Sequence, residues 1–269
     1  MKTARRSKSG LRFYQYVFIV LVYLFIYLPI FSVVLYSFNK NPDNMKFVGF
    51  TFDYYGKALS GGPLLESMWT SVILALCAMA VSVVIGTLAT IGMYRYEFRL
   101  KKYINALLYI PLVIPELVIG IASLTAFSKM GVPMGFISML FAHVTFCIPF
   151  VIITLRARIA DFDRSVEEAA MDLGANRWRT LWRVTLPMLA PGIGAGALMS
   201  ISLSIDDVII SSFLTAAGQD TFPVNIYARA RSKTTTDIYA ISTMLMVAVV
   251  LIVVAYYIIK RIWRKKHPD

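Results

Sequence analysis

Three acidic residues interrupt stretches of sequence that otherwise carry no charge: Glu116, Asp206 and Asp207. If these stretches span a membrane, an ionised side chain at a helix centre costs about 2.5–3.5 kcal/mol, or roughly 8–10 kcal/mol for all three when unpaired. No Lys or Arg occurs in the same stretches to neutralise them. We therefore expect the three carboxylates to face water, to be protonated or to meet a cation that arrives from elsewhere.

Helical spacing predicts which faces the two aspartates occupy. Asp207 belongs to a row of polar residues at intervals of four, three and four, so these side chains share one helix face. Asp206 is turned about 100° away from Asp207 and lies over Ser202. Asp207 rather than Asp206 is expected to face a pathway, because it continues the polar row. That row consists of Ser200, Ser204, Asp207 and Ser211.

Glu116 has a comparable setting, one helical turn before Gly120. Pro111 and Pro115 remove backbone hydrogen bonds beside it, and broken backbone at membrane depth is tolerated where it lines a cavity. The acids therefore either line a pathway for a cation or bond to serines and hold helices in register. The pathway is favoured because intramembrane acids are functional by default. His143 is interpreted as a hydrogen-bonded structural histidine rather than a proton relay.

The composition supports the membrane setting of these acids. Of 269 residues, 58% are hydrophobic and 16% charged, with a mean hydropathy of +0.67. Average soluble domains have about 45–50% apolar and about 25% charged residues, and disordered chains have low hydrophobicity. These values exclude a soluble globule and a disordered chain, and they predict an all-α integral membrane protein.

Long runs with few or no charges predict six membrane-spanning helices, since a span needs about 20 mostly apolar residues. A basic tail at 1–12 precedes them, a polar loop at 39–66 follows the first span, and a second basic tail occupies 260–269. Residues 67–259 form the core of the protein. The six spans are 13–38, 67–94, 103–128, 136–155, 192–214 and 238–259.

The basic residues predict the orientation of these spans. With the N-terminus inside, the N-terminal tail, the loop after the second span, the loop at 156–190 and the C-terminal tail hold five, four, six and five Lys and Arg. These twenty stand against seven outside, a clear positive-inside bias. Both termini and the 156–190 loop are thus expected in the cytoplasm, and the 39–66 loop outside. The net charge of +12 needs no nucleic acid as its explanation.

The 156–190 loop has a helical pattern of its own. Ser165 and Glu168 have the spacing of a capping box that starts a short helix, and Gly174 suits the left-handed position at its end. Asn176 is expected to cap a second helix that ends at Leu186-Pro187. Two interpretations stand side by side: a surface on which another protein docks, and a hairpin anchored at lipid headgroups by Trp178 and Trp182.

The same loop resembles the EAA loop of bacterial ABC-importer permeases of the type I, MetI-like family. The resemblance rests on Glu168-Ala169-Ala170, on Gly174 and on Val184-Thr185-Leu186-Pro187, with Val184 where Ile is usual. In that family the loop seats in a groove of a separate ATPase subunit. The resemblance implies that the ATPase-coupling residues are Glu167, Glu168, Ala169, Ala170, Gly174, Leu186 and Pro187.

Further stretches resemble the second permease subunit of spermidine/putrescine importers. They include Pro115-Glu116, the segment from His143 to Phe150 and the segment from Ser202 to Phe213; Glu116 stands where that family usually has Asp. The resemblance implies a polyamine permease of the bacterial inner membrane. It implies as partners a second homologous permease, an ATPase dimer and an extracytoplasmic substrate-binding protein. The outer segment 216–233 is expected to contact the binding protein.

Other classes of protein fit the sequence less well than a permease of an ABC importer. The chain lacks the GxxxxGK[ST] phosphate loop, so no cofactor is expected and ATP is bound by the partner ATPase. An ion-coupled secondary transporter would have no ATPase for an EAA loop to dock on, and a membrane enzyme would need more than His143 and His267. Importers of thiamine, ferric iron or aminophosphonate remain the alternatives within the family.

Overall fold

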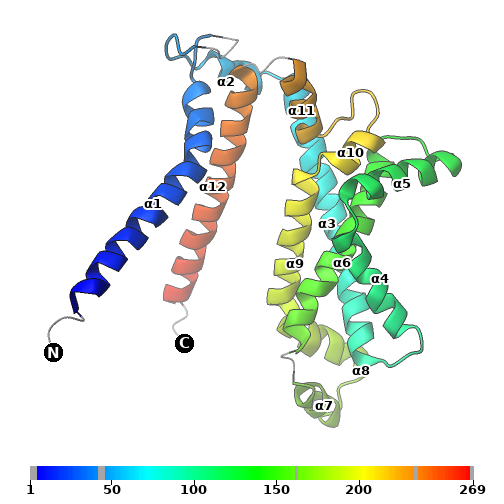
Figure 1. The fold of residues 1–269 in the computed structure, drawn as a ribbon. Coiled ribbons are helices and arrows are strands. Elements are labelled where there is room, and N and C mark those ends of the chain that lie inside the picture. Colours follow the sequence, from blue (N-terminus) through cyan, green and yellow to red (C-terminus); the bar gives the residue numbers. More distant parts are fainter. Residues whose placement is uncertain (1–4, 42–45, 161–162, 233–235, 267–269) are drawn as a thin grey trace. The chain divides into compact units, whose positions relative to one another are not determined.

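The computed structural model describes residues 5–41, 46–160, 163–232 and 236–266. Within these ranges the regular structure is helical, apart from one isolated β-bridge between Asn39 and Phe50. The chain forms two compact units, one made of 1–65 with 229–269 and the other of 66–228. Figure 1 shows the helices of both units in sequence colours.

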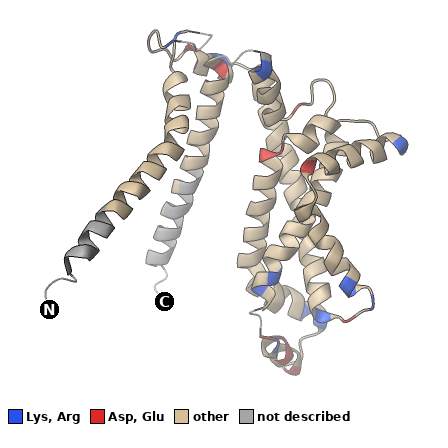
Figure 2. Cartoon of the chain, in the orientation of Figure 1, with Lys and Arg blue, Asp and Glu red and all other residues tan. Residues whose placement is uncertain are grey.

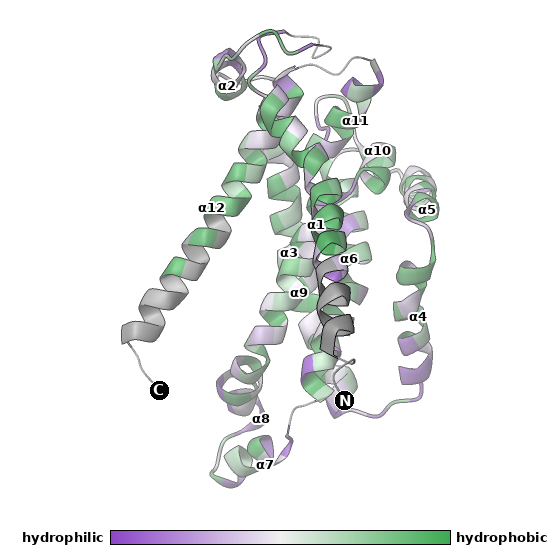
Figure 3. Cartoon of the chain, turned by 60° about the vertical axis from the view of Figure 1, so that its left-hand side comes forward, coloured by the Kyte–Doolittle hydropathy of each residue, from purple (hydrophilic) through white to green (hydrophobic). Residues whose placement is uncertain are grey.

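The first unit contains α1 (Arg5–Tyr36), α2 (Asp53–Leu59) and α12 (Thr236–Lys266). Helix α12 contacts both α1 and α2, and the hydroxyl of Thr236 donates a 2.6 Å hydrogen bond to the carbonyl of Asn41. Exposed apolar side chains occur along α1 from Tyr14 to Leu35, and Figure 3 shows the hydropathy of the helix. Such a surface suits lipid, because an apolar helix gains nothing from exposure to water.

The second unit carries the residues that the sequence singles out. Two long helices, α6 and α9, pack against each other in its core, together with α3. The helices are α3 (Pro63–Arg95), α4 (Lys101–Val113), α5 (Glu116–Lys129), α6 (Phe136–Ala160), α7 (Ser165–Asp172), α8 (Arg177–Thr180), η1 (Leu181–Thr185), α9 (Leu186–Asp206), α10 (Ile209–Leu214) and α11 (Phe222–Ser232).

Small residues permit the close packing of α9 on α6. A Cβ atom on Gly192 would come within 3.0 Å of the Cβ of Arg158, and one on Gly196 within 3.2 Å of a methyl group of Val151. Ser200, one turn further, is fully buried. The spacing of glycine, glycine and serine at intervals of four is the small-residue pattern that lets membrane helices approach.

Four described helical segments are long and apolar enough to cross a membrane: Tyr14–Tyr36, Pro63–Arg95, Phe136–Ala160 and Arg177–Asp206. A fifth crossing is formed if the bent pair α4 and α5 counts as one, and Thr236–Leu251 is a shorter apolar helix. These segments overlap the runs expected from the sequence, so the all-α fold with four or five apolar spans is confirmed for the described residues, and six crossings stay a prediction.

The third run differs most from a simple span. Instead of one helix over 103–128, α4 and α5 meet at an angle of 110°. The break falls at Ile114 and Pro115, while Pro111 is accommodated inside α4. The physical reason is that Pro115 forces the residue before it out of the helical region, and Ile114 is extended with ψ 130°.

The fifth run also differs from its expected limits. Leu186-Pro187 does not end the helix of the 156–190 loop, because Arg177–Asp206 is continuous through a π-helical turn at η1. In that turn the N–H of Leu186 donates to the carbonyl of Leu181, five residues back. Such a turn is one of the local adjustments that let a helix continue into a proline, here Pro187. The helix then stops at Asp206 rather than at 214.

Candidate functional site

The first functional region is the 156–190 loop, whose helix α7 begins differently from the expected capping box. Ser165 is the first helical residue and does not act as the cap. The Oδ1 atom of Asp163 accepts a 2.9 Å hydrogen bond from the backbone N–H of Ser165 instead. Bonds from Ser165 hold the pKa of Asp163 below its ordinary value. The capping-box prediction is wrong because the helix begins one residue earlier than a Ser165 cap requires, with the N–H of Ser165 bonded to Asp163.

The end of α7 is confirmed. Gly174 has φ +87°, the left-handed conformation that only glycine adopts without strain. Its N–H donates to the carbonyl of Met171 at 2.9 Å, and the N–H of Ala175 donates to that of Ala170 at 3.0 Å. These two bonds form a Schellman motif, which closes the last turn. Asn176 caps α8 as expected, since its Oδ1 accepts from the N–H of Arg179 at 2.8 Å.

The two adjacent acids of α7 have opposite environments. Glu167 is buried and forms a 2.6 Å ion pair with Arg95 at the end of α3. The hydroxyl of Thr185 in η1 donates to the same Glu167 oxygen and accepts a 2.8 Å hydrogen bond from Arg95. Glu168 is exposed. Glu167 thus ties α7 to α3 and η1, whereas Glu168 is presented at the surface.

The residues around Glu168 form the exposed side of α7. Ala169 is exposed and Ala170 is half-buried, so no large side chain covers this part of the helix. A cleft of about 230 Å³ lies beside it and is bounded by Glu168, Met171 and three arginines, Arg95, Arg164 and Arg177. This combination of small residues, one acid and a basic rim is a surface on which a protein can dock closely.

The Trp pair of the loop lies together on one side of the helix that begins at α8. The rings of Trp178 and Trp182 pack edge to face with centroids 5.8 Å apart, and both side chains remain exposed. Their spacing of four residues places them on the same helix face. Pro187 is exposed and Leu186 half-buried on the same continuous helix.

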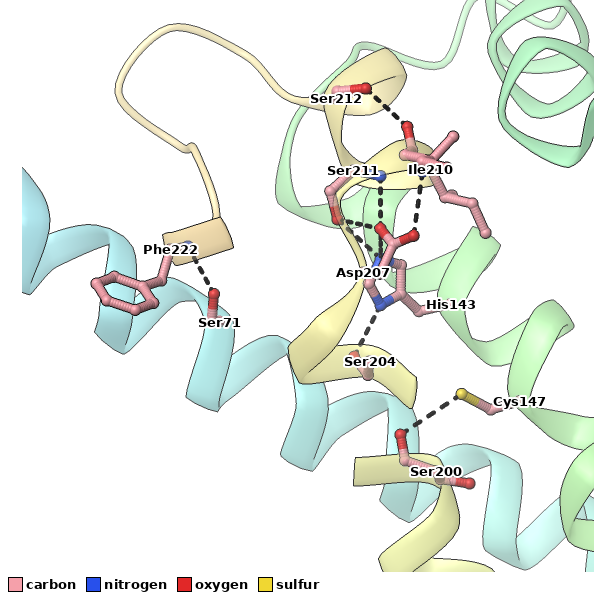
Figure 4. Close-up of polar contacts among 11 residues, drawn as sticks. Ser71, His143, Cys147, Ser200, Ser204, Asp207, Ile210, Ser211, Ser212 and Phe222 are labelled. Atoms are coloured by element: carbon pink, nitrogen blue, oxygen red, sulfur yellow. Dashed lines mark hydrogen bonds and ion pairs between the residues drawn. The ribbon is translucent and has the colours of Figure 1, made fainter. Parts of the chain in front are cut away.

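The second functional region contains the three acids of the apolar helices, and here Asp207 is the buried one. Only 7% of the surface of Asp207 is exposed. One carboxylate oxygen accepts from the N–H of Ile210 at 3.1 Å, and the other accepts from the N–H and hydroxyl of Ser211, both at 2.7 Å. The carboxylate therefore caps the first turn of α10, as Figure 4 shows.

His143 of α6 completes this cluster. Its Nε2 atom lies 3.3 Å from the carboxylate of Asp207 and 3.0 Å from the hydroxyl of Ser211, and its Nδ1 atom lies 2.7 Å from the hydroxyl of Ser204. The interpretation of His143 as a hydrogen-bonded histidine is confirmed. The alternative in which an acid bonds to serines and holds helices in register describes Asp207, which accepts from Ser211 and lies beside His143.

The polar row on α9 faces protein rather than a cavity. Ser200 bonds to the hydroxyl of Ser82 on α3 at 3.2 Å, and its carbonyl accepts from the thiol of Cys147. The row does share one face, but that face packs against α3 and α6. Asp206 is the exposed member of the aspartate pair, so the structure reverses the expected order of exposure of the two acids.

Glu116 is the third acid, and it is exposed at the first residue of α5. One turn later, Gly120 packs on α10: a Cβ atom there would lie 2.7 Å from the ring of Phe213 and 3.5 Å from the Cα of Ile210. Asp206 and Asp207 lie just before α10, on which α5 packs, so the three acids lie around the same helix contact. Figure 2, in which Asp and Glu are red, shows acidic residues at the end of α9 and at the start of α5.

The 216–233 segment is attached to the same unit at two points. The side chain of Gln219 accepts a 2.7 Å hydrogen bond from the N–H of Phe136, the first residue of α6. The N–H of Phe222, at the start of α11, donates to the hydroxyl of Ser71 on α3 at 2.8 Å. Between these points Gly218 has φ +76° and Ala217 is exposed. Lys233 lies outside the described residues.

These features define a membrane-embedded permease subunit, and the comparisons with known proteins agree. The chain belongs to the family of binding-protein-dependent transport system inner membrane components, whose model matches residues 82–266. It is accordingly a permease component of an ABC importer in the bacterial inner membrane, and not an enzyme.

Individual relatives narrow the comparison. The chain is 34% identical over 244 residues to the spermidine/putrescine transport system permease protein PotC of Escherichia coli K12, covering 91% of this chain and 92% of the relative. It is 30% identical over 264 residues to the putrescine transport system permease protein PotI of the same organism, covering 95% and 94%. A 2-aminoethylphosphonate permease, PhnV of Salmonella typhimurium, is 26% identical and covers 87% and 88%.

Solved structures confirm the fold. A bacterial ABC transporter involved in alginate import matches with a TM-score of 0.73 over 97% of this chain and 99% of the solved one, at 15% identity. The MetNI methionine transporter matches with a TM-score of 0.59 over 75% and 95%, at 17% identity. The chain therefore has the type I ABC permease fold.

Proposed function

We propose that this permease carries polyamines such as spermidine and putrescine. The observation that carries the proposal is the placement of two exposed carboxylates at apolar helix ends. Asp206 lies just before α10, and Glu116 begins α5, which packs on α10. Carboxylates in such surroundings are best neutralised by a cation that passes them. The relatives at 34% and 30% identity carry spermidine and putrescine in their names, which supports ammonium groups as those cations.

All three acids were candidates for the substrate site, and we now assign them different parts. The oxygens of Asp207 are taken by Ile210, Ser211 and His143, so its charge is used within the protein. Asp206 and Glu116 present their carboxylates at the surface and are the residues that would contact an ammonium group. Asp207 would contribute through the shape of the break between α9 and α10.

Polyamine uptake by the reconstituted importer tests this assignment. Asp206→Asn and Glu116→Gln keep the side-chain volume but remove one negative charge each. Loss of a hydrogen bond to a charged group is worth about 1.5–3 kcal/mol, so each variant should reduce polyamine uptake roughly 10- to 150-fold. Asp53→Asn, an exposed acid of α2, is the control and should retain wild-type uptake.

Wild-type uptake by both variants would remove the two acids from the substrate path. Uptake of thiamine, ferric iron or 2-aminoethylphosphonate in place of polyamines would contradict the substrate class, and competition with these compounds decides between them. The phosphonate carries negative charge, which Asp206 and Glu116 would repel.

We further propose that the exposed side of α7 seats in a separate ATPase subunit, which binds the ATP. Glu168, Ala169 and Ala170 would form the contact, and Gly174 would set the turn that follows it. Leu186 and Pro187, the first residues of α9, would transmit the movement of the loop along that helix. Glu167 would hold α7 in place from inside. The support is the exposure of Glu168 and Ala169 beside the arginine-rimmed cleft.

Substitution of Gly174 tests the docking role. Gly174→Val should abolish co-purification of the ATPase and polyamine uptake, since φ +87° is strongly disfavoured for a β-branched residue while no atom obstructs the site. Gly174→Asn should retain most of both, because Asn tolerates this conformation. Glu168→Lys should weaken ATPase binding without unfolding the loop. Normal ATPase binding in Gly174→Val and Glu168→Lys would remove the docking role.

The assembly would contain a second homologous permease, an ATPase dimer and an extracytoplasmic binding protein. Six spans with both termini and the 156–190 loop in the cytoplasm are consistent with the positive-inside distribution of charge. The 216–233 segment would then face the binding protein. A cysteine at Ala217 should crosslink to that protein in the active complex, and a cysteine at Ala169 should not; the reverse result would invert the topology.

A further inference from the structure

The helix is interrupted between α9 and α10, and the protein must stabilise this interruption. Asp207 leaves the helix with ψ 122°, and α10 restarts at Ile209. A break removes backbone hydrogen bonds, and at membrane depth water is not available to replace them. The carboxylate of Asp207 supplies two of the missing acceptors, to the N–H groups of Ile210 and Ser211.

His143 bridges this break from a different helix. Its Nδ1 atom contacts Ser204, which precedes the break on α9, and its Nε2 atom contacts Ser211, which follows it on α10. Figure 4 shows the ring between the two sides of the interruption. The residue is 2% exposed, so water does not compete for either nitrogen.

The donors and acceptors of the cluster fit together without a conflict. The hydroxyl of Ser211 donates a hydrogen bond to Asp207. The hydroxyl oxygen of Ser211 therefore acts as the acceptor for the Nε2–H of His143. The same N–H also points to the nearby Asp207 carboxylate. A fully satisfied polar cluster in a buried site is rigid, because every rotation of the ring would leave a polar group unpaired.

The fixed break in turn sets the position of α5. Ile210, whose N–H is held by Asp207, lies against Gly120 through its backbone, and Phe213 of α10 covers the same glycine. Gly120 is one turn from Glu116 on α5. Asp206 is the last residue of α9, which precedes the break. Glu116 is the first residue of α5, which packs on α10 after the break.

We propose that His143 is a positioning residue that sets the spacing between Asp206 and Glu116, the two carboxylates offered to an ammonium-bearing substrate. The inference rests on the proposed function only for the identity of the substrate; the spacing itself is a property of the fold. His143 does not contact the substrate in this scheme. It fixes the angle between α9 and α10 and thereby the position of α5, which packs on α10. The separation of positive charges that is accepted follows from that position.

Crosslinking between the two acid positions measures this spacing without any polyamine. Asp206→Cys and Glu116→Cys are combined in a Cys77→Ser background, and Cys147 is retained because it is fully buried. Thiol-reactive bifunctional reagents of graded length are applied to the assembled importer. With His143 present we expect one favoured reagent length. With His143→Leu we expect that preference to fall about tenfold, the size of one lost hydrogen bond to a charged group.

Cys147→Ala is the matched control, since Cys147 lies one turn further along the same buried face of α6 and its thiol bonds to the carbonyl of Ser200, which precedes the break. It should retain the wild-type preference. If His143→Leu fails to assemble, Ser204→Ala removes one arm of the bridge and leaves the ring in place; it should broaden the preference to a smaller extent.

The outcomes separate the two proposals. An unchanged length preference in His143→Leu and Ser204→Ala overturns the positioning role, and so does an equal loss in Cys147→Ala. Polyamine uptake tests the same role in the working importer. If His143 acts through the spacing of the acids, His143→Leu should reduce uptake much less in an Asp206→Asn background than in the wild type. Full additivity overturns the inference, whereas wild-type uptake by Asp206→Asn overturns the proposed substrate site and leaves the crosslinking result standing.

Discussion

Adjacent acids occur in both functional regions, as Glu167–Glu168 in α7 and as Asp206–Asp207 at the end of α9. In each pair one acid is buried and bonded and the other is exposed. Glu167 is held by the guanidinium of Arg95 and the hydroxyl of Thr185. Asp207 is held by the imidazole of His143, the hydroxyl of Ser211 and two backbone N–H groups.

The difference between the pairs lies in the partner of the buried acid. The guanidinium of Arg95 is itself partly exposed, with a side-chain exposure of 21%. In the apolar core an arginine would be expensive to bury, and the acid is satisfied by a histidine and by neutral donors. The same division between an anchoring acid and a presented acid is thus built with different chemistry in the two environments.

The largest effect should come from breaking the anchor of α7. Arg95→Ala leaves Glu167 without its ion-pair partner in a site where its side chain is 10% exposed. Removing one member of a buried pair costs about 3–5 kcal/mol, and solvent access at Arg95 places this case near the lower value. We expect faster proteolysis of the 156–190 loop and loss of ATPase co-purification. Arg95→Lys should be milder, and wild-type behaviour of Arg95→Ala would show that Glu167 is not an anchor.

A smaller effect on stability should separate the two aspartates. Asp207→Asn replaces one acceptor oxygen by an amide group that faces the N–H of Ser211, and should lower the stability by about 1.5–3 kcal/mol. Asp206→Asn should stay within about 0.5 kcal/mol of the wild type, as surface substitutions do. Thermal melting of the purified permease measures both. Equal melting temperatures would contradict the division of roles.

The smallest effect should come from the cap of α7. Asp163 has a lowered pKa, so its stabilising bond to Ser165 is fully present above the ordinary pKa of an aspartate and is lost as the pH falls through the lowered value. At neutral pH the cap is intact, and acidification to pH 5 should not affect it. Asp163→Asn should keep ATPase binding and Asp163→Ala should weaken it slightly. Acid sensitivity of ATPase binding near pH 5 in the wild type, absent in Asp163→Asn, would contradict this account.

Much of the coupling region was predictable because its signals are local in sequence. Gly174 and Asn176 act on backbone groups within a few residues, so spacing alone predicts the Schellman turn and the cap of α8. The capping box failed for an equally local reason: α7 begins at Ser165 itself, whose N–H donates to the side chain of Asp163.

The apolar runs, their approximate limits and the presence of acids within them follow from the sequence by itself, because the length and polarity of a span are set by the bilayer. The spacing of Gly192, Gly196 and Ser200 is likewise a sequence pattern that favours close helix packing. The breaks at Pro115 and Asp207 are only partly local. Proline explains the first, and no residue at the second forbids a helix.

Tertiary structure decided which acid of each pair is presented. Arg95 is 72 residues from Glu167 and His143 is 64 residues from Asp207 in the sequence, so no periodicity joins them. The serine row correctly placed Asp207 on one face of α9, but a row of polar residues suits a wet pathway and a polar helix contact equally well. Only the packing of α6 against α9 shows that His143 meets Asp207 there and that Asp206 is left exposed, because burial depends on the neighbouring helix and not on the helix that carries the acid.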